Sequence, residues 1–413
     1  MNLFRSRFGA LLGVAALAVL AACTGTSEPR PPTLLLVGIE AAGTPRLLLV
    51  EDVTATAPPG SPRLTVVPGG ARDLQAPAVA LDFENRAGAR EAVWVLTRRI
   101  VDGAGGPEVS AYLQRFEVHD IDPLSPTAFS EDVPARITLT LPGGGGVLDG
   151  LSLTSPATCP TAVQVARDGR LAAVLDDPSV CGLSDHSELW LIDTTGTEPP
   201  RALEDNNQLV AAGVYLDQRP DDERLYFLID AISNTHVYVD DLDGTPSYRL
   251  PQAVLPRRGI DLLEVKGSGD ALIALTATEL VSIDLTQPSV AAVISSTLST
   301  GAARVQADPW GVAPDVIVLG TSRTAVHETI ADTDPDTTGF TAVAVTIDPV
   351  IYFAYGVSEG RIVIIDLLTG GSSGESLRVH GEQLTAVTLP DGPAGPESLS
   401  VISWIRALAP LGP

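Results

Sequence analysis

Histidine, cysteine and positive charge are scarce in this sequence, and their scarcity excludes several kinds of protein. The 413 residues include five histidines and three cysteines, and no two histidines stand at the spacing of metal ligands. Lys266 is the only lysine, and 26 basic residues stand against 51 acidic ones, for a net charge of −25. Because such a surface repels phosphate backbones, we expect no nucleic-acid partner.

Long helical patterns are also missing. Beyond residue 30, no long stretch shows an apolar stripe with a period of 3.6 residues. The apolar residues come instead as short Val/Leu/Ile runs that are interrupted by 38 glycines and 33 prolines. Short apolar runs between turn residues are typical of strands, so the sequence predicts an all-β protein.

The first residues form a targeting segment that does not belong to the fold. Arg5 and Arg7 precede the apolar stretch "ALLGVAALAVLAA" (10–22), which is too short to span a bilayer comfortably. The segment ends in "LAAC" (20–23), which resembles the lipobox of bacterial lipoproteins. The alternative is an ordinary signal peptide with a chance cysteine.

The lipobox resemblance implies a location in the cell envelope. It implies a signal peptide over 1–22, cleavage before Cys23, and attachment of diacylglyceryl and palmitate chains to that cysteine. Residues 23–32 would then be a lipidated tether, followed by one domain over 33–413. Several acyl chains anchor a protein stably to a membrane. Thr24 replaces the aspartate that retains such proteins at the inner membrane, which favours the outer membrane in a cell that has one.

Cys159 and Cys181 remain once Cys23 is lipidated, and an even pair in an exported protein indicates a disulfide. The runs "TAVQVA" (161–166) and "LAAVLD" (171–176) flank Asp168-Gly169, which predicts a two-residue hairpin turn. That hairpin would bring the two cysteines to the same open end. A reactive or metal-binding pair is the alternative, but no further ligand stands at a suitable spacing.

One sequence motif, an apolar run that ends in aspartate, recurs along the chain. Its clearest copies end at Asp193, Asp243, Asp284 and Asp366. The last interval is twice the one before it, so we expect a weaker copy near residues 325–332. Each unit holds three or four short strands in roughly 40–50 residues, which is the size of a β-propeller blade. We expect each closing aspartate to accept backbone N–H groups of the following turn.

Counting the units predicts a single β-propeller of seven blades, with six or eight as alternatives. The strands over 33–53 and over 384–405 are each an incomplete blade, so we expect the N- and C-terminal strands to pair in one sheet. A Pro/Gly-rich insertion over about 124–157 interrupts the repeat. Two β-sandwich domains in tandem are the competing architecture.

Two stretches resemble known propeller repeats. "RLAAVLDDPSVCGLSDHSELWLIDTTG" (170–196) and "VIYFAYGVSEGRIVIIDLLTG" (350–370) resemble the YVTN-type repeat. "RIVIIDLLTGG" (361–371) is also similar to the repeats of outer-membrane assembly propeller lipoproteins and of quinoprotein dehydrogenases. The resemblance implies an architecture, a propeller, and assigns no activity.

Few residues are candidates for a site. Asp332, Asp334 and Asp336 alternate as in a calcium loop, but Thr337 and Val343 stand where an EF-hand has glycine and glutamate. They are weak candidates for a looser Ca²⁺ site, and otherwise form a solvated acidic loop. Trp310, in the loop "DPWGVAPD", is a weak candidate for contact with a partner or sugar.

No catalytic constellation emerges, so no cofactor is expected and two functions remain open. The first is a lipid-anchored envelope propeller that binds or scaffolds an envelope protein or glycan without catalysis. The second is a propeller enzyme, a lactonase-like hydrolase or a quinoprotein-type oxidoreductase, with its site at the mouth of the channel.

Overall fold

The computed structural model describes most strands and turns between Thr33 and Ile405. The described residues are 33–41, 43–52, 64–86, 89–117, 121–122, 125–126, 151–152, 159–183, 187–203, 210–217, 223–231, 234–240, 242, 253–255, 259–264, 271–276, 279–284, 291–295, 302–307, 316–320, 324–327, 336–337, 343–348, 353–358, 361–367, 378–382 and 397–405.

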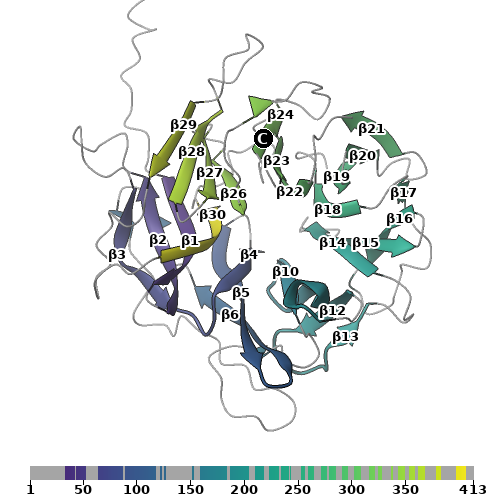
Figure 1. Cartoon of the computed structure of the whole chain (residues 1–413), viewed down its shortest axis with the longest axis horizontal. Coiled ribbons are helices and arrows are strands. Elements are labelled where there is room, and N and C mark those ends of the chain that lie inside the picture. Colours follow the sequence, from purple (N-terminus) through teal and green to yellow (C-terminus); the bar gives the residue numbers. More distant parts are fainter. Residues whose placement is uncertain are drawn as a thin grey trace, which may run out of the picture.

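These residues form an all-β protein with one 3-10 turn, η1 (Pro178–Cys181). The described strands make seven four-stranded antiparallel sheets and one two-stranded sheet. Figure 1 shows the four-stranded sheets arranged around a common centre, with one edge of each sheet turned inward.

Within each sheet, hydrogen bonds join the strands in the following order. The first three sheets are β30 (Glu397–Ile405), β1 (Thr33–Ala41), β2 (Thr44–Asp52), β3 (Leu64–Asp73); β4 (Ala78–Arg86), β5 (Ala89–Gly103), β6 (Gly106–Glu117), β9 (Leu151–Ser152); and β10 (Pro160–Val165), β11 (Leu171–Asp176), β12 (Glu188–Asp193), β13 (Arg201–Ala202). The next two are β14 (Val210–Asp217), β15 (Arg224–Ala231), β16 (Asn234–Asp240), β17 (Ala253–Leu255); and β18 (Gly259–Glu264), β19 (Ala271–Thr276), β20 (Leu280–Asp284), β21 (Ala291–Ser295). The last two are β22 (Ala302–Ala307), β23 (Val316–Gly320), β24 (Thr324–His327), β25 (Asp336–Thr337); and β26 (Ala344–Asp348), β27 (Phe353–Ser358), β28 (Arg361–Asp366), β29 (Arg378–Glu382). The two-stranded sheet pairs β7 (Ile121–Asp122) with β8 (Ser125–Pro126).

The first and the last of the described strands lie side by side. β1 pairs antiparallel with β30, so this sheet is built from both ends of the sequence. The innermost strands β30, β4, β10, β14, β18, β22 and β26 each contact the innermost strands of both neighbouring sheets. Backbone hydrogen bonds between segments so distant in sequence cover strand edges that would otherwise be exposed.

Four of the sheets contribute buried side chains to two separate cores, and β2 shows how. Successive side chains of a strand point to opposite faces. Leu47 and Leu49 pack in a core shared with β4 and β5, whereas Leu48 and Val50 pack in a core shared with β27 and β28. The continuous apolar run of this strand is therefore required by two packed neighbours.

The repeat is more regular in the structure than in the sequence. In six of the seven four-stranded sheets, the third strand ends at or near the residue that pairs with the start of the second strand. That position is held by Asp52, Asp193, Asp240, Asp284, His327 and Asp366. The unit expected to close at Asp243 therefore closes at Asp240, because Asp240 pairs with Leu225. His327 falls within the range expected for the weaker copy, and Asp52 is a copy that sequence reasoning missed.

The hairpin between β10 and β11 turns over four residues instead of the expected two. Ala166 still pairs with Leu171, and the backbone N–H of Gly169 donates to the carbonyl oxygen of Ala166 at 2.8 Å. Gly169 has φ 72°, in the left-handed region that favours glycine. The predicted turn residue is therefore correct, but the loop around it is longer.

Gly169 also touches a buried ion pair in the neighbouring sheet. Arg115 Nε donates to Glu84 Oε1 at 2.5 Å, Arg115 Nη2 donates to Glu84 Oε2 at 2.9 Å, and Trp94 Nε1 donates to Glu84 Oε1 at 2.8 Å. All three side chains are buried. A Cβ added to Gly169 would meet Glu84 Oε1 and its carboxyl carbon, and Glu84 cannot move away without losing these partners.

We predict that Gly169→Ala destabilises the protein by about 1–3 kcal/mol, because it combines a left-handed backbone with a clash against a fixed carboxylate. Urea unfolding measures the change. Gly105→Ala is the matched control, since nothing lies within 4 Å of its added Cβ and no positive φ applies. An equal effect of the two variants would contradict this packing of Gly169 against Glu84.

Candidate functional site

Most residues singled out from the sequence lie outside the described part of the chain. Cys23, Trp310, Asp332 and Asp334 are among these residues. Asp336 begins β25, where only its backbone is described. Within the described residues, no group of three or more His, Cys, Asp or Glu side chains could hold a metal ion. Among the described residues, no helix is long and apolar enough to cross a membrane.

The closing aspartates could have formed a reactive ring of carboxylates, but Asp193 is occupied by its own turn. Asp193 Oδ1 accepts the backbone N–H of Thr195 at 2.8 Å, and Asp193 Oδ2 accepts those of Thr197 and Glu198 at 2.9 and 2.8 Å. The hydroxyls of Thr195 and Thr197 donate to the same carboxylate. The expectation that this residue satisfies a turn is confirmed at Asp193.

These contacts govern the ionisation of Asp193. Burial alone would raise its pKa, but the hydrogen bonds from Thr197, Thr195 and Glu198 outweigh burial and hold the pKa well below its usual range. A carboxylate that accepts so many donors is a permanent anion that fixes the turn. It is therefore unsuited to act as a general acid at neutral pH.

A second group of polar side chains lies between the sheet that contains β1 and the sheet that contains β27. Thr33 Oγ1 donates to Asp348 Oδ2 at 2.5 Å, and Tyr355 OH donates to Asp52 Oδ2 at 2.7 Å. Burial, followed by the charge of Asp52, raises the pKa of Tyr355 well above its usual value. All four residues are buried, so these contacts link two sheets and offer a solute no access.

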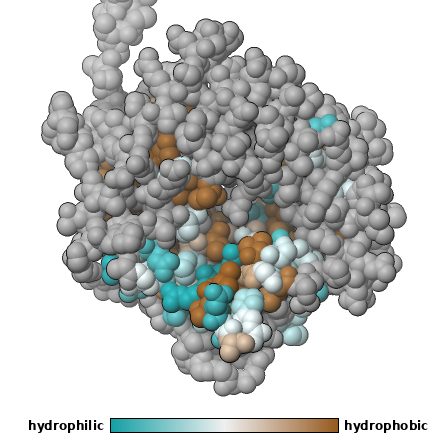
Figure 2. All heavy atoms as spheres, in the orientation of Figure 1, coloured by the Kyte–Doolittle hydropathy of each residue, from teal (hydrophilic) through white to brown (hydrophobic). Residues whose placement is uncertain are grey.

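Polar side chains of the innermost strands are used in the same way. Asp82 Oδ2 in β4 accepts the backbone N–H of Val165 in β10 at 2.6 Å, and Gln164 Oε1 in β10 accepts that of Leu216 in β14 at 3.2 Å. Each side chain thus satisfies a donor on the inner edge of the next sheet. In Figure 2, hydrophobic and hydrophilic residues lie together on the described part of this face, from its centre downward.

The clearest departure from the regular sheets is a projecting hairpin. β5 and β6 pair continuously from Ala92↔Glu117 to Gly103↔Gly106, whereas β4 pairs with β5 only as far as Thr97. Residues 98–111 therefore form a two-stranded ribbon that continues past the sheet (Figure 1). We call this segment the ribbon. Sequence reasoning treated β5 and β6 as ordinary blade strands, although "RRIVDGAGGPEVS" (98–110) continues the strands around a glycine-rich turn.

The ribbon exposes apolar side chains on both of its faces. Ile100 is 42% exposed and Val101 is 52% exposed, and adjacent residues of a strand point to opposite faces. Arg99 Nη2 lies 4.0 Å from Glu40 Oε1 of β1. Arg99 and Val101 are two residues apart in the strand, so they lie on the same face of the ribbon. β-Branched residues are common at strand surfaces that pack against another element. Their exposure on a projecting ribbon makes it the candidate binding surface among the described residues.

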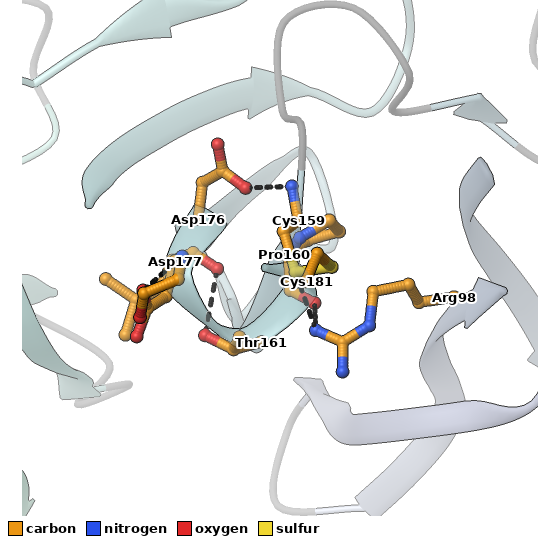
Figure 3. The surroundings of a disulfide bond; sticks show 9 residues. Arg98, Cys159, Pro160, Thr161, Asp176, Asp177 and Cys181 are labelled. Atoms are coloured by element: carbon orange, nitrogen blue, oxygen red, sulfur yellow. Dashed lines mark hydrogen bonds between the residues drawn. A yellow bond between two sulfur atoms is a disulfide. The ribbon is translucent and has the colours of Figure 1, made fainter. Parts of the chain in front are cut away.

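The base of the ribbon is fixed to the next sheet by Arg98 and a disulfide (Figure 3). Arg98 Nη1 donates to the carbonyl oxygen of Pro160 at 2.9 Å and lies 3.3 Å from Cys159 Sγ. Cys159 is joined to Cys181, with their Cα atoms 6.1 Å apart. The structure therefore brings together the two cysteines singled out from the sequence, and adds an arginine from β5 that sequence reasoning missed.

The turn that contains Cys181 is held at both ends. Asp177 Oδ1 accepts the backbone N–H of Ser179 at the start of η1. Gly182 ends η1 in the left-handed conformation, with φ 75°. The backbone N–H of Asp177 donates to the carbonyl oxygen of Cys159 at 2.9 Å, so Cys181 lies one 3-10 turn beyond the residue opposite Cys159. The disulfide thus spans the hairpin end and η1.

Comparison with known proteins supports a fold but identifies no family or activity. No protein-family model and no curated protein matches the chain. A solved structure of a protein from Lactobacillus plantarum aligns with a TM-score of 0.50 and 12% identity, over 91% of this chain and 100% of its own. A structure of a nidogen/laminin complex aligns with a TM-score of 0.42 and 15% identity, over 74% of this chain and 92% of its own. The first likeness supports a β-propeller fold.

We predict that Asp193→Asn lowers the free energy of unfolding at pH 7 by about 1 kcal/mol, because an amide accepts fewer of the turn donors than a carboxylate does. The pKa of Asp193 is lower in the folded protein than in the unfolded chain, so its ionised carboxylate stabilises the fold above pH ~4. This stabilisation is lost as the pH falls toward the lowered pKa. Urea unfolding from pH 7 to pH 3 should show the two proteins converging at low pH. Asp102→Asn, on the exposed ribbon, is the control; a difference that grows toward low pH would refute the assignment.

Proposed function

We propose that the protein is a lipid-anchored β-propeller of the cell envelope that binds an envelope protein or glycan without catalysis. The proposed anchor is Cys23, with exposure on the periplasmic or surface side of a bacterial membrane. The observation behind a binding role is the ribbon, because Ile100 and Val101 are exposed on a projecting pair of strands. Exposed apolar side chains on a preorganised strand pair favour a protein partner over a glycan.

We further infer that the seven four-stranded sheets are the blades of one seven-bladed propeller that is closed by β1 and β30. Three observations support this inference: the sheet count, the pairing of β1 with β30, and the cycle of contacts among the innermost strands. A disc of packed blades has little internal freedom. It is therefore a suitable base from which to present the ribbon at a fixed angle.

The described polar clusters give less support to a propeller enzyme. Asp52, Asp348, Glu84 and Arg115 are buried between sheets, and Asp193 is committed to its turn. Catalytic acids and bases need access to a substrate as well as a suitable pKa. The binding role is therefore preferred to a lactonase-like or quinoprotein-type activity.

The ribbon can be tested by photo-crosslinking of the full-length protein in its own cells. With p-benzoylphenylalanine at position 100, we expect one dominant adduct with an envelope protein, and Val101→Asp should weaken it at least about ten-fold through loss of apolar contact. The matched control places the probe at position 343, where Val343 is 59% exposed immediately before β26. Identical adducts from both positions, or turnover of a lactone or alcohol by the purified protein, would contradict the binding role.

The anchor requires a separate test. We predict that Cys23→Ala prevents lipid attachment and moves the protein from the membrane fraction to the soluble envelope fraction, because the acyl chains supply the membrane affinity. Fractionation and mass analysis of the mature N-terminus measure both effects. Cys181→Ala is the control, since it removes a cysteine without touching the anchor. Persistence of the Cys23→Ala protein in the membrane fraction would refute the anchor, and this result is independent of what the ribbon binds.

A further inference from the structure

The two sulfur atoms of the disulfide lie in different surroundings. Cys159 is 0% exposed, whereas Cys181 is 6% exposed and stands at the end of η1. The neighbours of Cys181 in the chain, Val180 and Gly182, are both exposed. An incoming reagent therefore meets Cys181 first, and Cys159 lies behind it.

A cation stands beside the buried sulfur. Arg98 Nη1 lies 3.3 Å from Cys159 Sγ, and the same nitrogen donates to the carbonyl oxygen of Pro160 at 2.9 Å, which fixes its position. Figure 3 shows the guanidinium reaching from β5 to the disulfide. A guanidinium keeps its charge at any pH of interest, and a neighbouring cation stabilises a thiolate relative to a thiol.

Two carboxylates in the same region are held by donors of their own. The carboxylate of Asp176 accepts the backbone N–H of Cys159. Asp177 Oδ1 accepts the backbone N–H and the hydroxyl of Ser179 at 3.1 and 2.6 Å. Their negative charge opposes thiolate formation, but these donors partly neutralise it. Arg98, by contrast, places an N–H directly against the sulfur.

We propose that the Cys159–Cys181 disulfide is a thiol-exchange site for a dithiol reductant, attacked at Cys181 and assisted by Arg98 at Cys159. A thiolate of the reductant bonds to Cys181 Sγ, the Cys159–Cys181 bond breaks, and its electron pair leaves on Cys159 Sγ as a thiolate beside Arg98. The second thiolate of the reductant then attacks the reductant sulfur that is bonded to Cys181, and Cys181 is released as a thiolate. Two electrons pass from the dithiol, which becomes a cyclic disulfide, and water protonates the released thiolates as their pKa values require.

This exchange acts at the base of the ribbon. The disulfide joins η1 to the start of β10, and Arg98 begins the ribbon while holding Pro160 of β10. Reduction removes the covalent link between η1 and β10 beside the ribbon base, while the contact of Arg98 with Pro160 remains. The site is independent of what the ribbon binds, so the proposal stands or falls separately from the proposed function.

The test measures the rate of reduction of the folded mature chain by dithiothreitol at pH 7.5, followed by quenching and counting of alkylated thiols. We expect Arg98→Gln to slow reduction by about three- to ten-fold, since a leaving thiolate of higher pKa leaves more slowly. Arg98→Lys, which keeps the charge, should lie between that variant and the wild type. Arg99→Gln is the matched control, because Arg99 points to the opposite face toward Glu40, and its rate should stay within about two-fold.

The position of attack is read with a monothiol. Folded protein is treated with glutathione, trapped with acid, digested and analysed by mass spectrometry, and we expect the adduct on Cys181. An adduct mainly on Cys159 would overturn the proposal. So would equal rates for the Arg98→Gln and Arg99→Gln variants, or reduction of the wild type only at the rate of global unfolding. A loosened Arg98→Gln protein would be reduced faster, which also contradicts the expected result.

Discussion

The structure depends on one packing constraint: a sheet that stands between two other sheets must bury both of its faces against them. The alternating leucines of β2 meet this constraint by supplying two separate cores from one continuous apolar run. A sheet at either end of such a series would expose an apolar face to water at about 25 cal/mol per Å². An arrangement around a centre gives every sheet two neighbours, and the pairing of β1 with β30 makes one sheet from both ends of the chain.

Buried polar contacts complement this packing. Glu84, Arg115 and Trp94 interact within one sheet, whereas the Thr33–Asp348 and Tyr355–Asp52 pairs join two sheets. Buried charges are costly unless each is paired, so such groups have few alternative arrangements. The Thr33–Asp348 and Tyr355–Asp52 pairs therefore help to specify how two neighbouring sheets are aligned, while the apolar cores provide the driving force. Their burial also explains why Glu84, Asp348 and Asp52 form no accessible site.

The functional candidates lie where the regular pattern stops. The ribbon begins where β4 no longer pairs with β5, and the disulfide closes the hairpin end beside it. Arg98 connects these two features through Pro160 and Cys159. A regular blade has its groups committed to sheet packing and turns, as Asp193 illustrates. The ribbon and the Cys159–Cys181 disulfide are not needed for the packing of a regular blade, so they are available for recognition or regulation.

The sequence alone determined the all-β class, the repeat and the turn chemistry, because strand alternation and residues such as Gly169 and Asp193 act locally. It also singled out Cys159 and Cys181, whose hairpin lies within one short stretch. Tertiary structure decided the rest. The register with Leu225 placed the closing position at Asp240 instead of Asp243, and Arg98 reached the disulfide only because β5 packs beside β10. Contacts between sheets join residues far apart in the chain, and no local pattern in one sequence records them.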